Sequence, residues 1–309
     1  MQRDTLQKLC KSLIDSSFSL HSRVHKMKGD DLYVKRDDEL GFGISGSKLR
    51  KYVSILPYLK KRGKKVALVG SFYSNHVLSL LQLLKQEGIA YQLFLEKPRS
   101  LKGNAFFLSL LIKEDEVIWI EDSSDFKVSE EFLQIPMGGC MKEALAGSLT
   151  LPLDILQNEE DLNLLFHHIF VDAGSGMSAI ALLLGMSYMQ KNVHIHVVLM
   201  AGKEKDFREK LRFFHAYLQE ILEESFPLLL YQILFPITAK SFGSHNATIF
   251  QIIKKTAEKE GVFLDPLYTA KLLLTTQDAL QKESLGGNVL WIHSGGALSL
   301  AGFQESYFT

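Results

Sequence analysis

Lys48 has the sequence setting that amine chemistry requires. It follows the small residues of Gly43-Ile-Ser-Gly-Ser47 and opens an apolar pattern that includes Leu49, Val53 and Leu56. The small residues predict a tight turn, and the spacing predicts a helix that begins near Lys48. The positive end of a helix dipole and a partly dry setting lower an amine's pKa, which suits a lysine that bonds a carbonyl compound. A solvated lysine on a basic helix is the alternative that this stretch leaves open.

Gly70-Ser-Phe-Tyr-Ser-Asn-His76 could hold the carboxylate of a ligand. It lies between a predicted apolar strand, 65–70, and a predicted helix, 75–87. Hydroxyl, amide and helix N–H groups come together there, and such a set of donors accepts a carboxylate. Ser74 and Asn75 would also serve as plain helix caps, which is the structural alternative.

Asp172-Ala-Gly-Ser-Gly-Met-Ser178 could hold a phosphate. It joins a predicted strand, 168–172, to a predicted helix, 177–190. Glycines in such a turn let backbone N–H groups converge on an anion, and the helix dipole favours it. The stretch is not the dinucleotide-binding fingerprint, so by itself it is weak evidence for phosphate.

Two more predicted strand or turn ends carry polar side chains. Leu264-Asp-Pro-Leu-Tyr268 precedes a predicted helix, and Trp291-Ile-His-Ser-Gly-Gly296 ends a predicted strand. Ligands of parallel sheets bind at the carboxyl ends of strands, so these ends are candidate site segments. The structural alternatives are a packed Tyr268 with its hydroxyl satisfied and a hydrogen-bonded core histidine at His293.

We expect no metal site in this chain. Four histidines lie in or beside predicted strands: His167, His168, His194 and His196. None of them has a carboxylate or cysteine partner at metal-ligand spacing. Cys140 could be a small buried hydrophobe as readily as a reactive thiol.

Together these stretches suit one cofactor. A lysine, a set of carboxylate donors, a phosphate-sized glycine turn and two polar strand ends are what a phosphorylated aldehyde requires. The combination indicates pyridoxal 5'-phosphate, although each motif alone is ambiguous.

The elements that must position these residues alternate between short β-branched runs and helical-period segments from residue 64 onward. This alternation predicts an α/β fold whose parallel sheets are covered by helices on both faces, in three layers. Two such series meet around Gly138-Gly139. The sequence therefore predicts two α/β units.

The composition excludes several classes of function. The chain has 309 residues, enough for one large or two medium domains. Lys plus Arg equals Asp plus Glu at 35 each, so no net field recruits nucleic acid or an anionic membrane. The N-terminus lacks the apolar core of a signal peptide, and the longest apolar stretch, 226–236, is too short for a bilayer. Two cysteines fit a reducing compartment, so we expect a cytoplasmic protein.

The chain resembles the pyridoxal-phosphate enzymes that group 1-aminocyclopropane-1-carboxylate deaminase with D-cysteine desulfhydrase. The matching stretches run in family order over most of the chain: Leu32-Tyr-Val-Lys-Arg-Asp-Asp38, Gly43–Lys51, Ser74–His76, Ile135–Gly139, Gly174–Gly176, Asp265–Lys271 and His293–Gly296. The resemblance implies the tryptophan synthase β fold (fold type II), with a large domain of residues 1–50 and 148–309 and a small domain of residues 51–147. It also implies a homodimer that acts on a small amino acid.

The resemblance assigns roles to particular positions. Lys48 matches the lysine that bonds the cofactor, and Tyr268 matches a tyrosine beside the substrate. The positions implied for the cofactor are Lys48, Asn75 at the 3-oxygen, Thr269 at the ring nitrogen, and Gly174, Ser175, Gly176, Met177 and Ser178 at the phosphate. The positions implied for the substrate are Ser74, Asn75, His76, Phe242 and Ser294, and those implied for catalysis are Lys48, Tyr268 and Ser74.

Thr269 and Ser294 favour one branch of this family. The desulfhydrases have hydroxyl residues at both positions, whereas the deaminases have a glutamate and a leucine. A carboxylate at the ring nitrogen makes a strong electron sink for opening a cyclopropane, whereas a hydroxyl suffices for losing a thiolate. We therefore expect elimination from D-cysteine to pyruvate, ammonia and sulfide, with the cyclopropane deaminase as the alternative. Met177 and Phe242 depart from the family, so a catalytically degenerate or substrate-shifted member is a further alternative.

Overall fold

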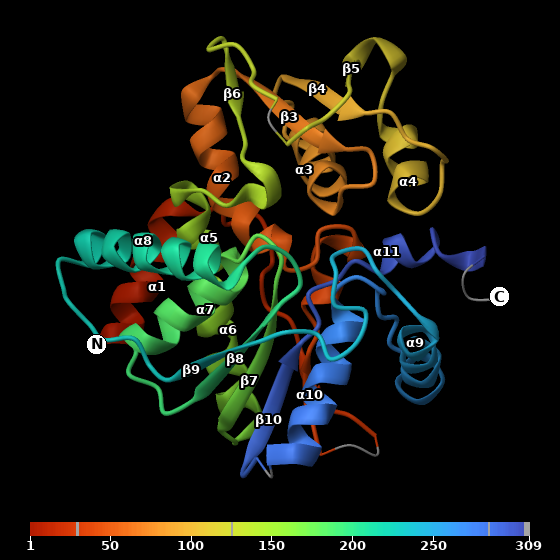
Figure 1. The fold of residues 1–309 in the computed structure, drawn as a ribbon. Coiled ribbons are helices and arrows are strands. Elements are labelled where there is room, and N and C mark those ends of the chain that lie inside the picture. Colours follow the sequence, from red (N-terminus) through yellow and green to blue (C-terminus); the bar gives the residue numbers. More distant parts are fainter. Residues whose placement is uncertain (29–30, 125, 284, 306–309) are drawn as a thin grey trace.

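The chain forms two β-sheets that lie among helices (Figure 1). The computed structural model describes residues 1–28, 31–124, 126–283 and 285–305. In these residues the larger sheet has the strand order β1-β2-β10-β7-β8-β9, and the smaller sheet has the order β5-β4-β3-β6. β1 and β2 pair antiparallel, and the other described pairs are parallel.

The strands are short. They are β1 (Val24–Lys26), β2 (Tyr33–Lys35), β3 (Lys65–Ser71), β4 (Tyr91–Glu96), β5 (Val117–Ile120), β6 (Phe132–Gln134), β7 (Phe166–Ala173), β8 (His194–Leu199), β9 (Tyr231–Leu234) and β10 (Asn288–Ile292).

The helices lie between them in the chain. They are α1 (Gln2–Leu13), α2 (Lys48–Arg62), α3 (Asn75–Gln86), α4 (Asn104–Leu111), α5 (Leu145–Ser148), α6 (Thr150–Leu162), α7 (Met177–Tyr188), α8 (Glu204–Leu222), α9 (Ala247–Glu260), α10 (Thr269–Glu283) and α11 (Ala297–Leu300). Short 3-10 helices are η1 (Asp37–Gly43), η2 (Glu114–Glu116), η3 (Met137–Gly139) and η4 (Lys142–Ala144).

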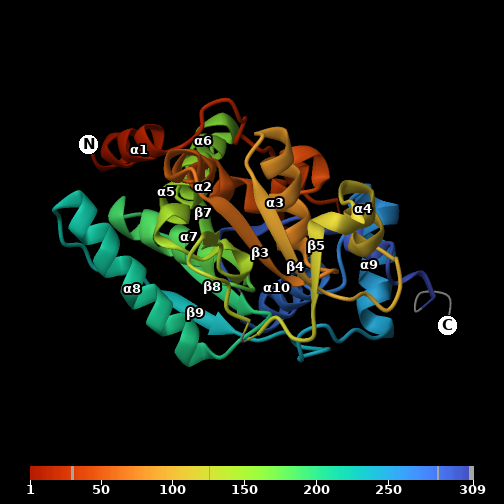
Figure 2. The ribbon, with the colours of Figure 1, turned by 90° about the horizontal axis from the view of Figure 1, so that it is seen from above.

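Helices cover both faces of the larger sheet. Side chains alternate along β7, so Ile169 and Val171 pack in one apolar cluster with α7, whereas Phe170 packs in another with α9 and α10. All three side chains are fully buried, and each such burial stabilises the fold by roughly 1.5–3 kcal/mol. Figures 1 and 2 show the smaller sheet, with α3 and α4, lying over one end of the larger sheet.

The structure confirms the predicted α/β architecture of parallel sheets between helices. The strands of the smaller sheet fall within 65–134, and those of the larger sheet fall within 24–35 and 166–292. The division into domains of 1–50 with 148–309 and of 51–147 stays a prediction, and α2 runs across its first boundary. No helix in the described part of the chain has both the length and the apolarity needed to cross a membrane.

A buried ionic network fixes the start of α2. Arg50 donates through Nε and Nη2 to the two carboxylate oxygens of Asp37 in η1, at 2.7 Å each. The same Nη2 donates to Oδ2 of Asp154 in α6 at 2.7 Å, and Lys35 of β2 pairs with that carboxylate. Lys35 also donates to Oδ1 of Asn158 at 2.6 Å. The four charged groups are buried, so each depends on its partners for compensation of its lost hydration.

The network predicts a large loss of stability when its central cation is removed. Arg50→Met leaves Asp37 and Asp154 buried without their main counter-charge, and we expect the free energy of unfolding to fall by about 3–5 kcal/mol. Urea unfolding measures this change. The matched control is Arg212→Met, at an exposed arginine of α8, which should change stability by less than about 0.5 kcal/mol. Equal stability of the two variants would contradict the proposed importance of the network.

Candidate functional site

A cavity of about 550 Å³ lies where the ends of both sheets meet. The segments that line it include the end of β3 with the start of α3, the start of α2, the loop after β7, the turn before α10 and the end of β10. These belong to stretches that the sequence indicated as candidate site segments, and Met137, Lys210 and Phe242 are among the residues that other segments add. The carboxyl ends of β3, β7 and β10 converge on it, as the topology of parallel sheets requires.

Lys48 is the first residue of α2 and lines this cavity, half-buried. Burial lowers the pKa of its amine below the ordinary value, and the nearby carboxylates of Asp172 and Asp265 oppose that shift. The turn before it is tied to the end of β10, because the Ser47 N–H donates to the Ser294 carbonyl at 2.9 Å. A side chain at Gly46, which has φ +55°, would collide with that same carbonyl. The predicted loop-to-helix junction is confirmed, and its glycine permits the close approach.

The loop after β7 lines the cavity at the start of α7, where the first N–H groups of a helix have no partner within the helix. Gly174, Ser175 and Gly176 all line the cavity, and Gly176 caps the helix at φ +93°. Met177 also contributes to the wall, but its side chain is fully buried among the apolar residues of α7. Because its bulk is directed into the core, Met177 is compatible with an anion at this helix end.

Two lysines that the sequence analysis did not select lie nearby, Lys210 against this loop and Lys51 against Gly138 of η3, which packs on Ser175. Lys210 of α8 donates to the Ser175 carbonyl at 3.2 Å, and Lys51 of α2 donates to the Gly138 carbonyl at 2.6 Å. Burial, together with the charge of Lys48, lowers the pKa of Lys51 to about 7. Lys51 could have been found from sequence, because it stands three residues after Lys48 and so lies on the same side of the helix. Lys210 gave no such signal.

Ser74, Asn75 and His76 begin α3 and line the opposite side of the cavity. The Ser74 hydroxyl accepts the N–H groups of His76 and Val77 at 3.2 and 3.3 Å, so it caps the helix and keeps its own proton for a ligand. Asn104 donates to Asn75 Oδ1 at 2.6 Å, which leaves the Asn75 NH₂ group as its free donor. The structural and functional interpretations of this stretch are therefore compatible.

His76 presents a neutral imidazole to the cavity. Burial, reinforced by the charges of Lys51 and Lys48, lowers its pKa to about 3. Its Nδ1 lies 2.8 Å from the hydroxyl of Tyr52, a phenol that burial keeps protonated, and that hydroxyl is also 3.4 Å from the His76 carbonyl. When the phenol donates to Nδ1, the ring proton is on Nε2, which is buried without a hydrogen-bond partner among the described residues.

Tyr268 and Phe242 lie together at the third side of the cavity. Their ring centroids are 5.9 Å apart in an edge-to-face arrangement, and both line the cavity. Burial, with the nearby charges of Asp265 and Asp172, raises the pKa of the Tyr268 phenol, so it keeps its proton. Gly174 admits this ring, because a Cβ there would meet Tyr268 Cε1 at 3.0 Å.

Thr269 differs from the other selected residues in its surroundings. Its hydroxyl lies 2.8 Å from both the Asp265 carboxylate and the Asp265 backbone N–H, and its side chain is fully buried. Ser294, by contrast, lines the cavity. The expected role of Thr269 at the ring nitrogen stays a prediction, while Ser294 is the hydroxyl residue on the cavity wall.

His293 is buried and bonded to the Phe263 carbonyl at 2.9 Å, as a core histidine would be.

Asp172, at the end of β7, is the carboxylate that sequence reasoning passed over. It lines the cavity beside Ser294, and its Oδ1 is buried without a hydrogen-bond partner. Burial raises its pKa to about 6, against the opposing influence of the Ser294 hydroxyl and the Lys48 charge. Its position at the mouth of the glycine turn was visible in the sequence, but its direction toward the cavity was not.

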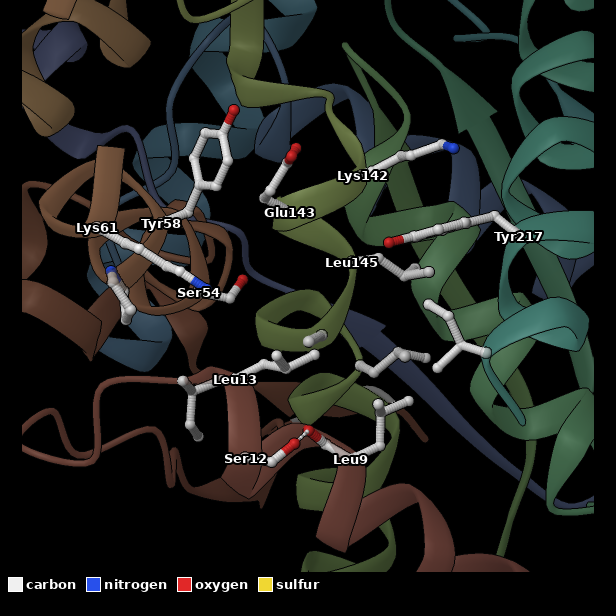
Figure 3. Close-up of a pocket in the computed structure, with 15 residues that line it drawn as sticks. Leu9, Ser12, Leu13, Ser54, Tyr58, Lys61, Lys142, Glu143, Leu145 and Tyr217 are labelled. Carbon is white, nitrogen blue, oxygen red and sulfur yellow. Dashed lines mark hydrogen bonds between the residues drawn. The ribbon is translucent and has the colours of Figure 1, made fainter. Parts of the chain in front are cut away.

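A second cavity, of about 410 Å³, lies on the other side of α2 (Figure 3). Its walls are mainly aliphatic side chains of α1, α2, α5 and α8, with Lys142 held over the Tyr217 ring at 4.5 Å. Ser54 there is already bonded to the Gly147 N–H at 3.0 Å. Buried polar atoms without a partner occur on the wall of the first cavity, at His76 and Asp172, and none in the described residues lines the second. The chemistry therefore belongs to the first.

Comparison with known proteins identifies the family. No protein-family model matches the chain. A provisionally named 1-aminocyclopropane-1-carboxylate deaminase of Pyrococcus horikoshii is 30% identical over 286 residues, covering 87% of this chain and 85% of that protein. The chain belongs to the family of 1-aminocyclopropane-1-carboxylate deaminase and D-cysteine desulfhydrase. A D-cysteine desulfhydrase of Serratia proteamaculans is 25% identical over 305 residues, covering 92% of each protein.

Solved structures confirm the fold. The crystal structure of a homologue of 1-aminocyclopropane-1-carboxylate deaminase superposes with a TM-score of 0.85 at 24% identity, over 98% of each chain. A threonine deaminase of Solanum lycopersicum superposes with a TM-score of 0.65 at 13% identity, over 95% of this chain and 85% of that one. These structures confirm the predicted fold-type-II architecture. The sequence relatives confirm the predicted family, which groups pyridoxal-phosphate enzymes.

The cavity residues fit pyridoxal phosphate. A buried amine of lowered pKa lies at Lys48, and a helix N-terminus with two lysines beside it suits a dianionic phosphate. The unpartnered Nε2 of His76 and Oδ1 of Asp172 are buried polar atoms of the wall that a polar ligand would satisfy.

The raised pKa of Asp172 predicts how stability varies with pH in the protein freed of cofactor. An aspartate of raised folded pKa stabilises the fold below its unfolded pKa of roughly 3.9, and this contribution is lost as pH rises through about 6. Relative to Asp172→Asn, the wild type should therefore lose roughly 2–3 kcal/mol of unfolding free energy between pH 4 and 7. Urea unfolding across this range measures it, with the exposed Asp115→Asn as control. A difference that is constant with pH would contradict the burial of this carboxyl.

Proposed function

We propose that the protein is a pyridoxal-phosphate-dependent lyase that removes a β-substituent from a small amino acid, with D-cysteine as the first candidate. The overall reaction converts D-cysteine and water to pyruvate, ammonia and hydrogen sulfide. The observation that carries this proposal is the half-buried Lys48 on a cavity with anion-binding groups on two sides. The relatives named D-cysteine desulfhydrase support the choice of substrate.

The cofactor would be held by three groups of residues. Lys48 would bond its aldehyde carbon, and the N–H groups of Gly174, Ser175, Gly176, Met177 and Ser178 would bind its phosphate, with Lys51 and Lys210 neutralising charge. The Asn75 NH₂ group is the donor available for the 3-oxygen. When bound, the cofactor supplies a conjugated ring that accepts the electron pair of Cα.

The chain's own residues would bind and orient the substrate. Ser74, Asn75 and His76 present a hydroxyl, an amide and an imidazole N–H, all donors, to the substrate carboxylate. Once its amine is free, Lys48 is the candidate base for removing the Cα proton. Its lowered pKa leaves a larger fraction of the amine unprotonated at neutral pH. Tyr268 keeps its proton and so could donate it to the departing sulfur. Phe242 contributes an apolar wall beside that ring.

A second candidate function is the deamination of 1-aminocyclopropane-1-carboxylate. Asp172 favours it, because a buried carboxylate near Ser294 could keep a ring nitrogen protonated and strengthen the electron sink. The relative of Pyrococcus horikoshii has this activity in its provisional name. Thr269 and Ser294, as hydroxyl residues, favour the desulfhydrase. A substrate-shifted or degenerate member is the third possibility, which Met177 and Phe242 suggested. Because the Met177 side chain packs into the core, Phe242 is the departure that still supports it.

The assay that separates these functions uses the purified protein loaded with pyridoxal phosphate. We expect sulfide and pyruvate from D-cysteine, little product from L-cysteine, and less 2-oxobutanoate than pyruvate from the cyclopropane substrate at equal concentration. A dominant cyclopropane activity would favour the second candidate. A yellow protein inert toward all three substrates would leave the degenerate or substrate-shifted alternative.

Lys48→Ala tests the role of the amine. We expect loss of the visible absorbance of the bound cofactor and at least a 10²- to 10⁴-fold fall in activity, on the order of a general base's contribution. Lys61→Ala, at an exposed lysine of the same helix, is the matched control and should retain both. An active Lys48→Ala variant would defeat the assignment.

The expected homodimer and cytoplasmic location stay predictions.

A further inference from the structure

Three histidines meet on the larger sheet at the end remote from the cavity. His168 is near the start of β7 and His194 begins β8, whereas the cavity lies at the carboxyl ends of these strands. The parallel register pairs His168 with His194 and Phe170 with His196. Because alternate residues of a strand share a face, all three histidines project from the same face, and the adjacent His167 projects from the other.

Their ring nitrogens lie at metal-ligand separation. One nitrogen from each ring falls within 4.8 Å of those of the other two, and Nδ1 of His168 is 3.1 Å from Nε2 of His196. Zinc bonds to imidazole are about 2.0–2.1 Å, which places tetrahedral ligand atoms roughly 3.3–3.4 Å apart. A shift of a few tenths of an ångström would therefore bring this pair to the ligand geometry.

An outer hydrogen bond orients the His196 ring. Nδ1 of His196 is 3.3 Å from Gln232 Oε1, an acceptor, so the N–H of this ring is on Nδ1 and its Nε2 carries a lone pair. That lone pair faces Nδ1 of His168 at 3.1 Å, where a metal ion would take the place of the proton that these two nitrogens otherwise share.

Packing fixes one ring of the cluster and leaves the other two accessible. His196 is held in place by stacking on Phe170, with centroids 4.2 Å apart and planes 5° from parallel. His168 and His194 are only half-buried, which leaves a route from solvent.

We propose that His168, His194 and His196 bind a divalent cation of the zinc class, with water completing the coordination. A hydrogen bond between His168 and His196 alone would use two rings. His194 lies two residues before His196 on the same strand and adds a third ring, with its centroid 4.4 Å from that of His196. Imidazole ligands suit zinc, copper and nickel, and oxygen-seeking ions such as magnesium would not be retained. A bound ion would link β7 to β8 and stabilise the fold by mass action. The expectation of no metal site relied on spacing along the chain, and strand pairing supplies a proximity that spacing does not contain.

The test titrates the full-length, cofactor-loaded protein with zinc chloride after treatment with a chelator. We expect about one zinc ion per chain by calorimetry, a rise in Tm, and an absorption band of tetrahedral coordination when cobalt(II) is used instead. His194→Gln should lose these responses. Gln232→Leu should weaken zinc binding by about 10- to 100-fold, the usual effect of losing an outer hydrogen bond to a ligand histidine.

His167→Gln is the matched control. It alters the neighbouring histidine of the same strand, whose Nδ1 accepts the Asn288 N–H at 3.1 Å and which is outside the three-histidine cluster, and it should bind zinc as the wild type does. Absence of zinc binding in the wild type, or equal loss in His167→Gln and His194→Gln, would overturn the proposal. Lyase activity is not a readout, so failure here leaves the proposed function untouched.

Discussion

The pairing of Arg50 with Asp37 and Asp154 is the interaction on which the site depends. It joins α2 to η1 and α6 in a buried region, and Lys35 extends it to β2. Lys48 stands only two residues before Arg50, so the network sets the axial position of the amine. Burial raises the pKa of Asp154, but the charges of Arg50 and Lys35 outweigh it and hold that pKa below the ordinary value. The Asp154 carboxylate is therefore ionised at neutral pH and can hold Arg50 at the start of the helix.

Helix geometry separates structure from chemistry along α2. At 100° per residue, Lys51 lies about 60° from Lys48, whereas Arg50 lies about 160° from it. The first two face the cavity and the third enters the ionic network. Opposite them, capping bonds hold Ser74, and bonds with Asn104 and Tyr52 hold Asn75 and His76. Each sheet thus contributes one side of the cavity through a helix N-terminus.

Much of this arrangement could be predicted from sequence because it is local. The start of α2 at Lys48, the cap of α3 at Ser74 and the turn before α7 all follow from neighbouring residues, and the structure confirms them. The helices α1 and α6 and the strands β1 and β6 were not predicted, and β1 and β6 have only three residues each.

The features that the sequence could not supply depend on distant partners. Asp154 is more than a hundred residues from Arg50, and His168 meets His196 only through strand register. Asp172 belongs to a selected stretch, yet its exposure to the cavity depends on how β7 lies beside β10. For Thr269, the family resemblance implies a hydroxyl at the ring nitrogen of the cofactor. In the structure this hydroxyl donates to the Asp265 carboxylate, a contact that the sequence did not indicate.

The most direct measurement of the central claim is the site of covalent attachment of the cofactor. The yellow, cofactor-loaded protein would be reduced with sodium borohydride, digested with a protease and examined by mass spectrometry. The account predicts a pyridoxyl group on Nζ of Lys48, in the peptide that also contains the turn Ser45-Gly-Ser47. Attachment at Lys51 or Lys210, or recovery of the Lys48 peptide without modification, would contradict it.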